Sequence, residues 1–184
     1  MKTTGVIRRI DELGRIVIPK EIRRNLGIRD GENMEIFTDD VSIILKKHSR
    51  IISSMDIINK IGDLTKNIMN YEIMVTDREK VIYAEGTSLS PCKDELLSQD
   101  LKNLIDARES INENEEQLIN FENSKINGYF SINPIISSND SIGLVIIYSS
   151  SKLSNAEINY SKLLAKLIGE KIDITWLNNF FMIK

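Results

Sequence analysis

The alternation of apolar and polar residues divides the chain into two regions. In residues 1–50, runs rich in β-branched residues predict strands at 5–11 and 15–18, joined by a turn at 12–14. Pro19 fixes its φ near the helical value and predicts a short helix over 20–26, which Gly27 ends. Two more strands are expected within 34–47, around a turn at 38–40. The predicted order is strand, strand, short helix, strand, strand.

From Ser49 onward the pattern changes. Apolar residues recur at intervals of four, three and four: Ile57, Ile61, Leu64 and Ile68. This spacing predicts an amphipathic linker helix within 51–70, which could pair with another helix or with its own copy in a second chain. Residues 71–184 then predict five strands, at 72–77, 80–84, 117–121, 128–136 and 141–150. Ser90-Pro91 predicts the start of one helix, and a capping box at Ser154 and Glu157 predicts the start of another. The expected class is α+β, with an antiparallel sheet flanked by helices.

Charge is unevenly distributed between the two regions. Residues 1–54 hold 11 Lys/Arg against 8 Asp/Glu, which gives +3; residues 55–184 hold 13 against 19, which gives −6, and the sum is the net −3. Within residues 1–29, 8 basic residues against 3 acidic ones give +5. A basic module on an acidic chain is typical of a protein in which one part approaches a polyanion.

Arginine dominates this basic segment. Five arginines but only two lysines occur before residue 25, and the planar guanidinium suits phosphate oxygens and guanine edges. Any single arginine is more often a solvated surface residue, but the set favours nucleic acid. Arg8 and Arg9 are consecutive strand residues, so at most one shares a surface with Arg15. In the short helix, Ile22 and Leu26 are expected to face inward and the intervening arginines outward.

A family resemblance rests on particular residues. The stretch MKTTGVIRRIDELGRIVIPKEIRRNLGI, followed by DGENMEIF and IILKK, resembles the N-terminal domain of AbrB-type transition-state regulators from spore-forming bacteria. The resemblance implies a swapped-hairpin β-barrel, in which two chains interleave their strands over residues 1–50, and a sequence-specific regulator of sporulation genes. The positions that match its DNA-contacting residues are Arg8, Arg15, Arg23 and Arg24, with Arg9, Lys2 and Lys20 as candidates for backbone contact.

The order of elements over 71–184 is similar to that of a GAF domain, a fold that often senses small molecules. No motif here names a ligand, so sensing and a purely structural role both stay open. The resemblance to AbrB-type regulators implies double-stranded DNA as partner and a homodimer through the barrel. A homotetramer is expected through C-terminal helices. The apolar end, 175–184, is expected to cover the sheet or a neighbouring subunit.

Other classes of protein are less well supported. An enzyme would need a nucleophile or an acid–base pair, and Cys92 and His48 have no identifiable helpers in the sequence. One cysteine and one histidine predict neither a disulfide nor a zinc site, so no metal or cofactor is expected. No apolar run is long enough for a membrane span, and we expect a cytoplasmic, nucleoid-associated protein. The nearer alternative is an antitoxin, whose toxin-binding tail would be disordered.

Overall fold

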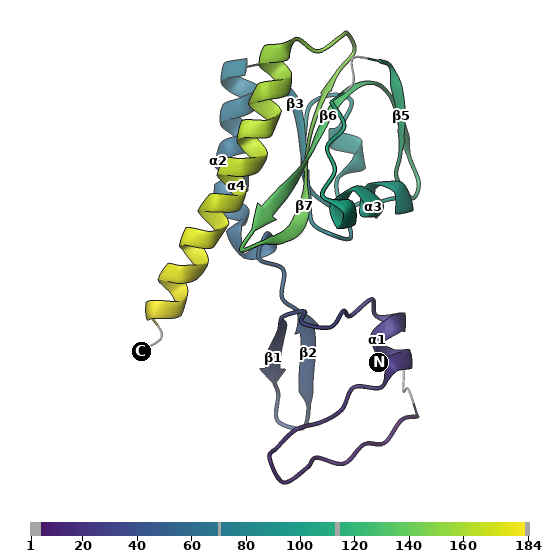
Figure 1. The fold of residues 1–184 in the computed structure, drawn as a ribbon, viewed down its shortest axis with the longest axis vertical. Helices are drawn as coiled ribbons and strands as arrows, with labels where there is room; N and C mark the ends of the chain where they lie inside the picture. Colours follow the sequence, from purple (N-terminus) through teal and green to yellow (C-terminus); the bar gives the residue numbers. More distant parts are fainter. Residues whose placement is uncertain (1–4, 70, 113–114, 183–184) are drawn as a thin grey trace. The chain divides into compact units, whose positions relative to one another are not determined.

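A computed structural model describes residues 5–69, 71–112 and 115–182, with side chains of the last helix up to residue 174 (Figure 1). The chain forms two compact units, Met1–His48 and Ser49–Lys184, which we call the first and the second unit and describe separately. No helix within the described ranges is both long and apolar enough to cross a lipid bilayer.

The first unit contains one short helix and one hairpin. The helix α1 (Lys20–Asn25) follows Pro19, as predicted. Strands β1 (Met34–Thr38) and β2 (Ile43–Lys47) pair antiparallel, so the predicted hairpin is confirmed. The carboxylate of Asp39 closes its turn by accepting hydrogen bonds from the backbone N–H groups of Val41 at 3.0 Å and Ser42 at 2.7 Å.

The segment before α1 differs from its prediction. Residues 5–18 form no strand, so the strands predicted at 5–11 and 15–18 are wrong for the single chain. The predicted turn is present, with Gly14 at φ +74 and its N–H donating to the carbonyl oxygen of Asp11 at 2.9 Å. Strand propensity is expressed only when a neighbouring strand supplies hydrogen bonds and packing, and in the single chain this segment pairs with no strand.

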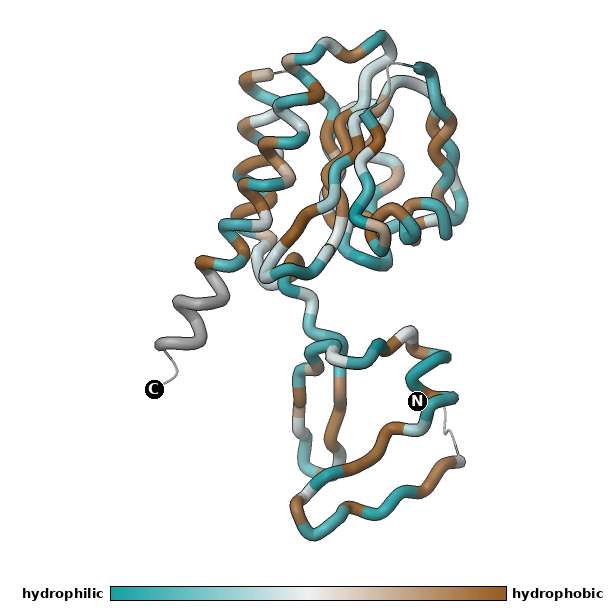
Figure 2. The backbone as a smooth tube through the Cα atoms, viewed as in Figure 1, coloured by the Kyte–Doolittle hydropathy of each residue, from teal (hydrophilic) through white to brown (hydrophobic). Residues whose placement is uncertain are grey.

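The first unit has no core of its own. None of its described residues, 5–48, is buried, and most of its large apolar side chains are exposed, from 37% for Leu45 to 94% for Val41. Figure 2 shows these apolar stretches along the segment before α1 and along the hairpin. Exposed apolar surface on this scale is typical of a protein interaction surface.

The second unit is built on a five-stranded antiparallel sheet. The strands are β3 (Glu72–Thr76), β4 (Val81–Glu85), β5 (Gln117–Asn120), β6 (Lys125–Ser137) and β7 (Asp140–Ser149), in the order β4-β3-β7-β6-β5. Strands were therefore predicted in the correct places, although β6 begins three residues earlier than expected. Because β7 is central, both its faces are buried and its sequence is almost continuously apolar.

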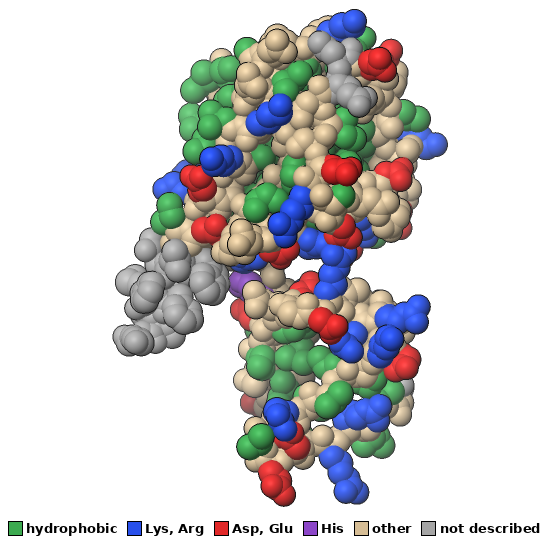
Figure 3. All heavy atoms as spheres, viewed as in Figure 1, with side chains coloured by type: hydrophobic (Ala, Val, Ile, Leu, Met, Phe, Trp, Pro, Cys, Tyr) green, Lys and Arg blue, Asp and Glu red, His purple; other side chains and the backbone are tan. Residues whose placement is uncertain are grey.

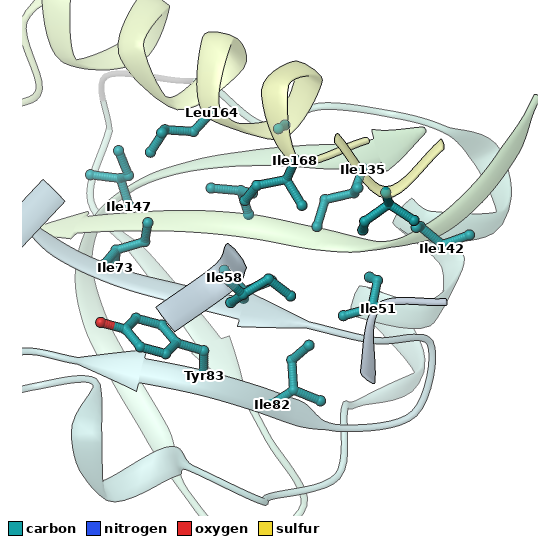
Figure 4. Close-up of a cluster of buried hydrophobic side chains, with 14 of the residues drawn as sticks. Ile51, Ile58, Ile73, Ile82, Tyr83, Ile135, Ile142, Ile147, Leu164 and Ile168 are labelled. Atoms are coloured by element: carbon teal, nitrogen blue, oxygen red, sulfur yellow. The ribbon is translucent and has the colours of Figure 1, made fainter. Parts of the chain in front are cut away.

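Helices cover both faces of the sheet. On one face lie α2 (Met55–Leu64) and α4 (Asn155–Met182), while α3 (Gln99–Ala107) packs on the other. Figure 4 shows the first of these cores, where Ile58 of α2 and Leu164 and Ile168 of α4 point toward Ile73 and Ile147 of the sheet. Alternate residues of β7 serve the two cores, as the period of a strand requires.

Capping residues explain where two helices begin. The capping box before α4 is confirmed: the Ser154 hydroxyl accepts from the N–H of Glu157 at 3.3 Å, and the Glu157 carboxylate accepts from the N–H of Ser154 at 2.5 Å. The start predicted at Ser90-Pro91 is wrong, although the predicted helix is present over Leu101 and Leu104. A single 3-10 turn, η3 (Ser90–Cys92), forms there, and α3 begins later, with Ser98 as its N-cap. The intervening chain instead joins the sheet by bridges from Leu96 and Leu97.

Residues 51–70, predicted as a helical linker, contribute to the core of the second unit. A 3-10 turn, η1 (Ile52–Ser54), leads into α2, and a π-helical turn, η2 (Thr65–Met69), follows it. The side of α2 that faces the sheet carries Ile58 and Gly62, and the ring of Tyr83 lies where a Cβ on Gly62 would be. The predicted seam is divided: Ile57 and Ile61 are half-buried, with Ile61 packed against the core, whereas Leu64 and Ile68 are exposed. Pairing of this seam with a second chain stays a prediction.

A polar cluster fixes the turn between β6 and β7. Its tip, Ser138-Asn139, has positive φ at both residues, as two-residue hairpin turns require. The carboxylate of Asp173, on α4, accepts from the hydroxyl of Ser137 at 2.5 Å and from the N–H of Ser138 at 3.0 Å. The guanidinium of Arg50 donates to Ser137 Oγ at 3.1 Å. The turn, the last helix and the start of the second unit are thus tied together.

Candidate nucleic-acid interface

The turn at 11–15 presents Arg15 from a closed loop. The N–H of Asp11 donates to the carbonyl oxygen of Arg15 at 3.0 Å, and Asp11 Oδ1 accepts from the N–H groups of Leu13 at 3.0 Å and Arg15 at 2.8 Å. The other carboxylate oxygen, Oδ2, accepts from Arg15 Nε at 2.7 Å. Hydrogen bonds from the backbone and then the side chain of Arg15 lower the pKa of Asp11, so its carboxylate is ionised at neutral pH.

The helix α1 presents Arg23 and Arg24 in its last turn. It ends in a Schellman motif, in which the N–H of Ile28 donates to the carbonyl oxygen of Arg23 at 2.7 Å and Gly27, at φ +60, donates to that of Arg24 at 3.1 Å. This motif confirms the predicted role of Gly27. Cations near the C-terminal end also favour the helix dipole.

The two helix arginines are not equivalent. Arg23 is half-buried and its Nη1 donates to the carboxylate of Asp30, whereas Arg24 is exposed. The prediction that Ile22 and Leu26 both face inward is wrong for the single chain: Ile22 is half-buried and Leu26 is 60% exposed. The reason is the same as for the missing strands, because one chain lacks the elements that would cover Leu26.

The remaining predicted contact residues are exposed. Arg8 donates only to the neighbouring carbonyl oxygen of Ile7, at 3.3 Å, among the described residues, and Arg9 and Lys20 are also exposed. Lys2 lies outside the described residues. Figure 3 shows Lys and Arg side chains on the first unit, interspersed with acidic and exposed apolar ones. The structure therefore places six of the seven predicted residues on the surface of one small unit.

Two acidic residues of this surface were not predicted from the sequence to take part in the site. Asp11 and Asp30 each pair with one of the candidate arginines. The spacing of Asp11 and Arg15, four residues apart, is a detectable signal, but it is usually associated with helices and this segment is a turn. Only the turn itself brings the two side chains together.

The other candidate chemical groups serve the structure. Cys92 is 1% exposed, and burial raises the pKa of its thiol, with an opposing effect of the contact to Ser124 Oγ at 3.2 Å. His48, expected to be exposed, is half-buried, with Nδ1 3.7 Å from Glu35 Oε2. Among the described residues no group of three or more His, Cys, Asp or Glu could hold a metal ion.

Comparison with known protein families gives matches over both units. The family "Stage V sporulation protein T C-terminal, transcription factor" matches residues 56–173. Residues 7–53 match the family "Antidote-toxin recognition MazE, bacterial antitoxin". The first match covers more than half of the chain and nearly the whole described part of the second unit.

Individual relatives agree with the family match. Transition state regulatory protein AbrB of Bacillus subtilis (strain 168) is 58% identical over 48 residues, 26% of this chain and half of AbrB. The solution structure of the N-domain of AbrB, also 58% identical, covers 26% of this chain and 92% of that domain, with a TM-score of 0.25. Stage V sporulation protein T of the same organism is 39% identical over 153 residues, 81% of this chain and 85% of the relative. The resemblance to AbrB-type regulators is thus confirmed, and the chain belongs to the family of the transcription factor stage V sporulation protein T.

Proposed function

We propose that this chain is a sequence-specific DNA-binding regulator of sporulation genes, in which two first units combine into one swapped-hairpin barrel. The observation that carries the proposal is the state of the first unit: its described residues include none that is buried, yet it has many exposed apolar side chains and a dense set of arginines. A second copy would cover the apolar surface and supply partners for the extended segment 5–18. The arginines would remain outside, available to DNA.

The arginines suit DNA for both chemical and electrostatic reasons. Each guanidinium that neutralises a phosphate releases counterions, so the affinity should fall with salt by about 0.9 log units per log unit of salt for each phosphate contact. An arginine that reaches a guanine edge adds roughly 1–3 kcal/mol of discrimination between sequences. Of the two arginines on α1, Arg24 is exposed, whereas Arg23 is half-buried and paired with Asp30.

The test is DNA binding by an Arg23→Ala, Arg24→Ala double variant across a salt series. We expect weaker binding to duplex DNA and a salt slope smaller by up to about 1.8, since two phosphate contacts would be lost. The matched control is Lys162→Ala with Lys166→Ala, which removes the same charge from exposed positions of α4. If both double variants bind DNA as the unsubstituted chain does, the first unit is not the DNA-binding surface.

For the second unit we propose a role in assembly. Exposed apolar side chains lie on both helices of this face and on the turn that follows α2: Leu64 on α2, Ile68 in η2, and Leu163 and Leu167 on α4. The two helices lie side by side, and Thr65 Oγ1 is 3.0 Å from the hydroxyl oxygen of Tyr160 (Figure 1). Their apolar side chains suit a helix–helix interface with a second copy, which would join two barrel dimers into a tetramer. Small-molecule sensing by this unit stays a prediction from its similarity to GAF domains.

The antitoxin alternative is favoured by one observation, the family match over 7–53. It requires a second half that is disordered until it binds a toxin. The two buried clusters of the second unit and its five-stranded sheet count against that requirement. DNA binding alone does not separate a transcriptional regulator from an antitoxin, because both bind DNA through the first unit. Limited proteolysis is therefore the second measurement. The tail of an antitoxin would be cleaved rapidly between 71 and 174.

A further inference from the structure

We propose that Asp11 is a positioning residue for DNA recognition, which holds the Arg15 guanidinium so that its two terminal amino groups face outward for a paired contact with DNA. The inference rests on the proposed function, because it assumes that Arg15 contacts DNA. It goes beyond it by assigning a role to an acidic residue on a surface that binds a polyanion. An acidic side chain on a DNA-binding surface repels the phosphates and so opposes binding. A compensating role, such as the positioning of an arginine, accounts for its presence there.

The geometry of the pair is specific. Asp11 Oδ2 accepts from Arg15 Nε at 2.7 Å, so the inner edge of the guanidinium is occupied. Within the described part of the chain, no other partner of this guanidinium is present, so the four N–H groups of Nη1 and Nη2 remain available. Two parallel N–H groups are the donors that a guanine edge or a pair of phosphate oxygens accepts.

The carboxylate that holds Arg15 is itself fixed. Its Oδ1 atom accepts from two backbone N–H groups, those of Leu13 and Arg15, and the same turn is closed by two backbone hydrogen bonds. The guanidinium is therefore held through a rigid loop rather than by another mobile side chain. Pre-ordering of a long side chain reduces the conformational entropy lost on binding.

A role in stability explains the pair less well. The side chain of Arg15 is 70% exposed and that of Asp11 43% exposed. Ion pairs at such exposure contribute little to the free energy of folding because water and salt screen them. The backbone contacts made by Oδ1 suffice to close the turn, which leaves the contact between Oδ2 and Nε for another purpose.

The chain contains a matched control for the charge of Asp11. Asp39, also in the first unit, closes the β1–β2 turn with the same kind of contacts, since its Oδ1 accepts from the N–H groups of Val41 and Ser42. Among the described residues, the side-chain hydrogen bonds of Asp39 are to Val41 and Ser42, and none is to an arginine. Asp11→Asn and Asp39→Asn thus remove the same charge and keep an oxygen that can accept from the turn, but only Asp11→Asn removes the acceptor of Arg15 Nε.

The experiment compares equilibrium binding of Asp11→Asn, Asp39→Asn, Arg15→Ala and the Asp11→Asn, Arg15→Ala double variant. Two duplexes of equal length are used: one selected from a random pool by the unsubstituted full-length chain, and one of scrambled sequence. We expect Asp11→Asn to weaken binding to the selected duplex by about tenfold, whereas Asp39→Asn leaves it unchanged or slightly tighter. In the Arg15→Ala background, Asp11→Asn should have no further effect.

The two duplexes distinguish the DNA groups that Arg15 contacts. A loss confined to the selected duplex assigns Arg15 to a base edge, and an equal loss on both assigns it to phosphate; either supports the positioning role. If Arg15→Ala binds weakly while Asp11→Asn behaves like Asp39→Asn, the inference about Asp11 is overturned and the proposed function stands. If Arg15→Ala and the unsubstituted chain bind equally, the role of Arg15 in the proposed function fails, and the role of Asp11 with it.

Discussion

The two units of this chain obtain their stability in different ways. The second unit buries two apolar clusters, one on each face of its sheet, within a single chain. The first unit, with a comparable richness in apolar residues, has no buried residue between 5 and 48. Its hairpin and helix are formed locally, but full burial of apolar side chains, the main source of folding free energy, is missing from its described residues. The difference shows that a helix and a hairpin can form from local signals where the described residues of a unit bury no side chain fully.

The strongest test of this difference between the units introduces a charge at one apolar residue in each unit. The two residues are chosen because their side chains are equally exposed in the single chain. Ile16 is 53% and Leu118 54% exposed in the single chain. We expect Ile16→Asp to unfold the first unit, at a cost of roughly 4 kcal/mol or more, because a barrel of two chains would bury the charge. Leu118→Asp, on the edge strand β5, should change stability by only about 0.5 kcal/mol. Hydrogen exchange of the β1–β2 amides provides the measurement.

The outcome for Ile16→Asp also decides the oligomeric basis of the first unit. If its β1–β2 amides stay as protected as in the unsubstituted chain, the first unit folds without a second copy and the barrel proposal is wrong. Protection that decreases with dilution of the unsubstituted chain would support the proposal independently, because the stability of an obligate dimer depends on concentration.

A second prediction concerns the helices of the second unit. Leu163→Asp with Leu167→Asp should reduce the molar mass in sedimentation equilibrium by half, from tetramer to dimer, while the second unit stays folded, since both side chains are already exposed. The control is Lys162→Asp with Lys166→Asp, at neighbouring exposed positions of α4. An unchanged mass for the leucine variant would mean that this helix face does not carry the assembly.

The smallest expected effect concerns Asp173 and pH. Burial alone would raise the pKa of Asp173, but hydrogen bonds from Ser137 and Ser138 and the charge of Arg50 outweigh it, so the pKa is lowered in the folded state. A lowered pKa contributes stability above the unfolded value, near 3.8, that is lost as the pH falls through the folded value. Asp173→Asn should therefore cost about 1–2 kcal/mol at neutral pH and much less in acid.

Denaturant unfolding of the second unit at several pH values checks this prediction. Asp140→Asn is the comparison, because its carboxylate is 58% exposed and its ion pairs with Arg50 and Arg78, at 3.5 and 3.8 Å, should contribute little. A stability difference for Asp173→Asn that is the same at neutral and acid pH would show that packing, rather than charge, explains its effect.

Sequence patterns predicted the second unit better than the first, for physical reasons. The run SIGLVIIYSS and the box at Ser154 and Glu157 determine their structures locally, and both predictions are confirmed. The start of α3 was misplaced because Ser90-Pro91 fits a helix start as well as Ser98 does, and the choice depends on bridges from Leu96 and Leu97 to distant strands. Contacts far apart in sequence leave no local pattern.

In the first unit, the hairpin and α1 follow from local signals, whereas the segment 5–18 forms no strand in the single chain. Its β-branched residues favour strands, but propensity alone does not pair them. For the candidate interface, composition and family resemblance identified the arginines. The ion pairs of Arg15 and Arg23 with acidic residues were not predicted, because they depend on how the turns at 11–15 and 27–31 close.

The burial of Cys92 makes it an internal reporter of the second unit. Its thiol lies in the cluster beneath α3, and its raised pKa keeps it in the unreactive protonated form. Alkylation therefore requires the surrounding structure to open, so the labelling rate measures the free energy of that opening under native conditions. Because the chain has no other cysteine, one reagent follows the second unit alone, whatever the first unit does.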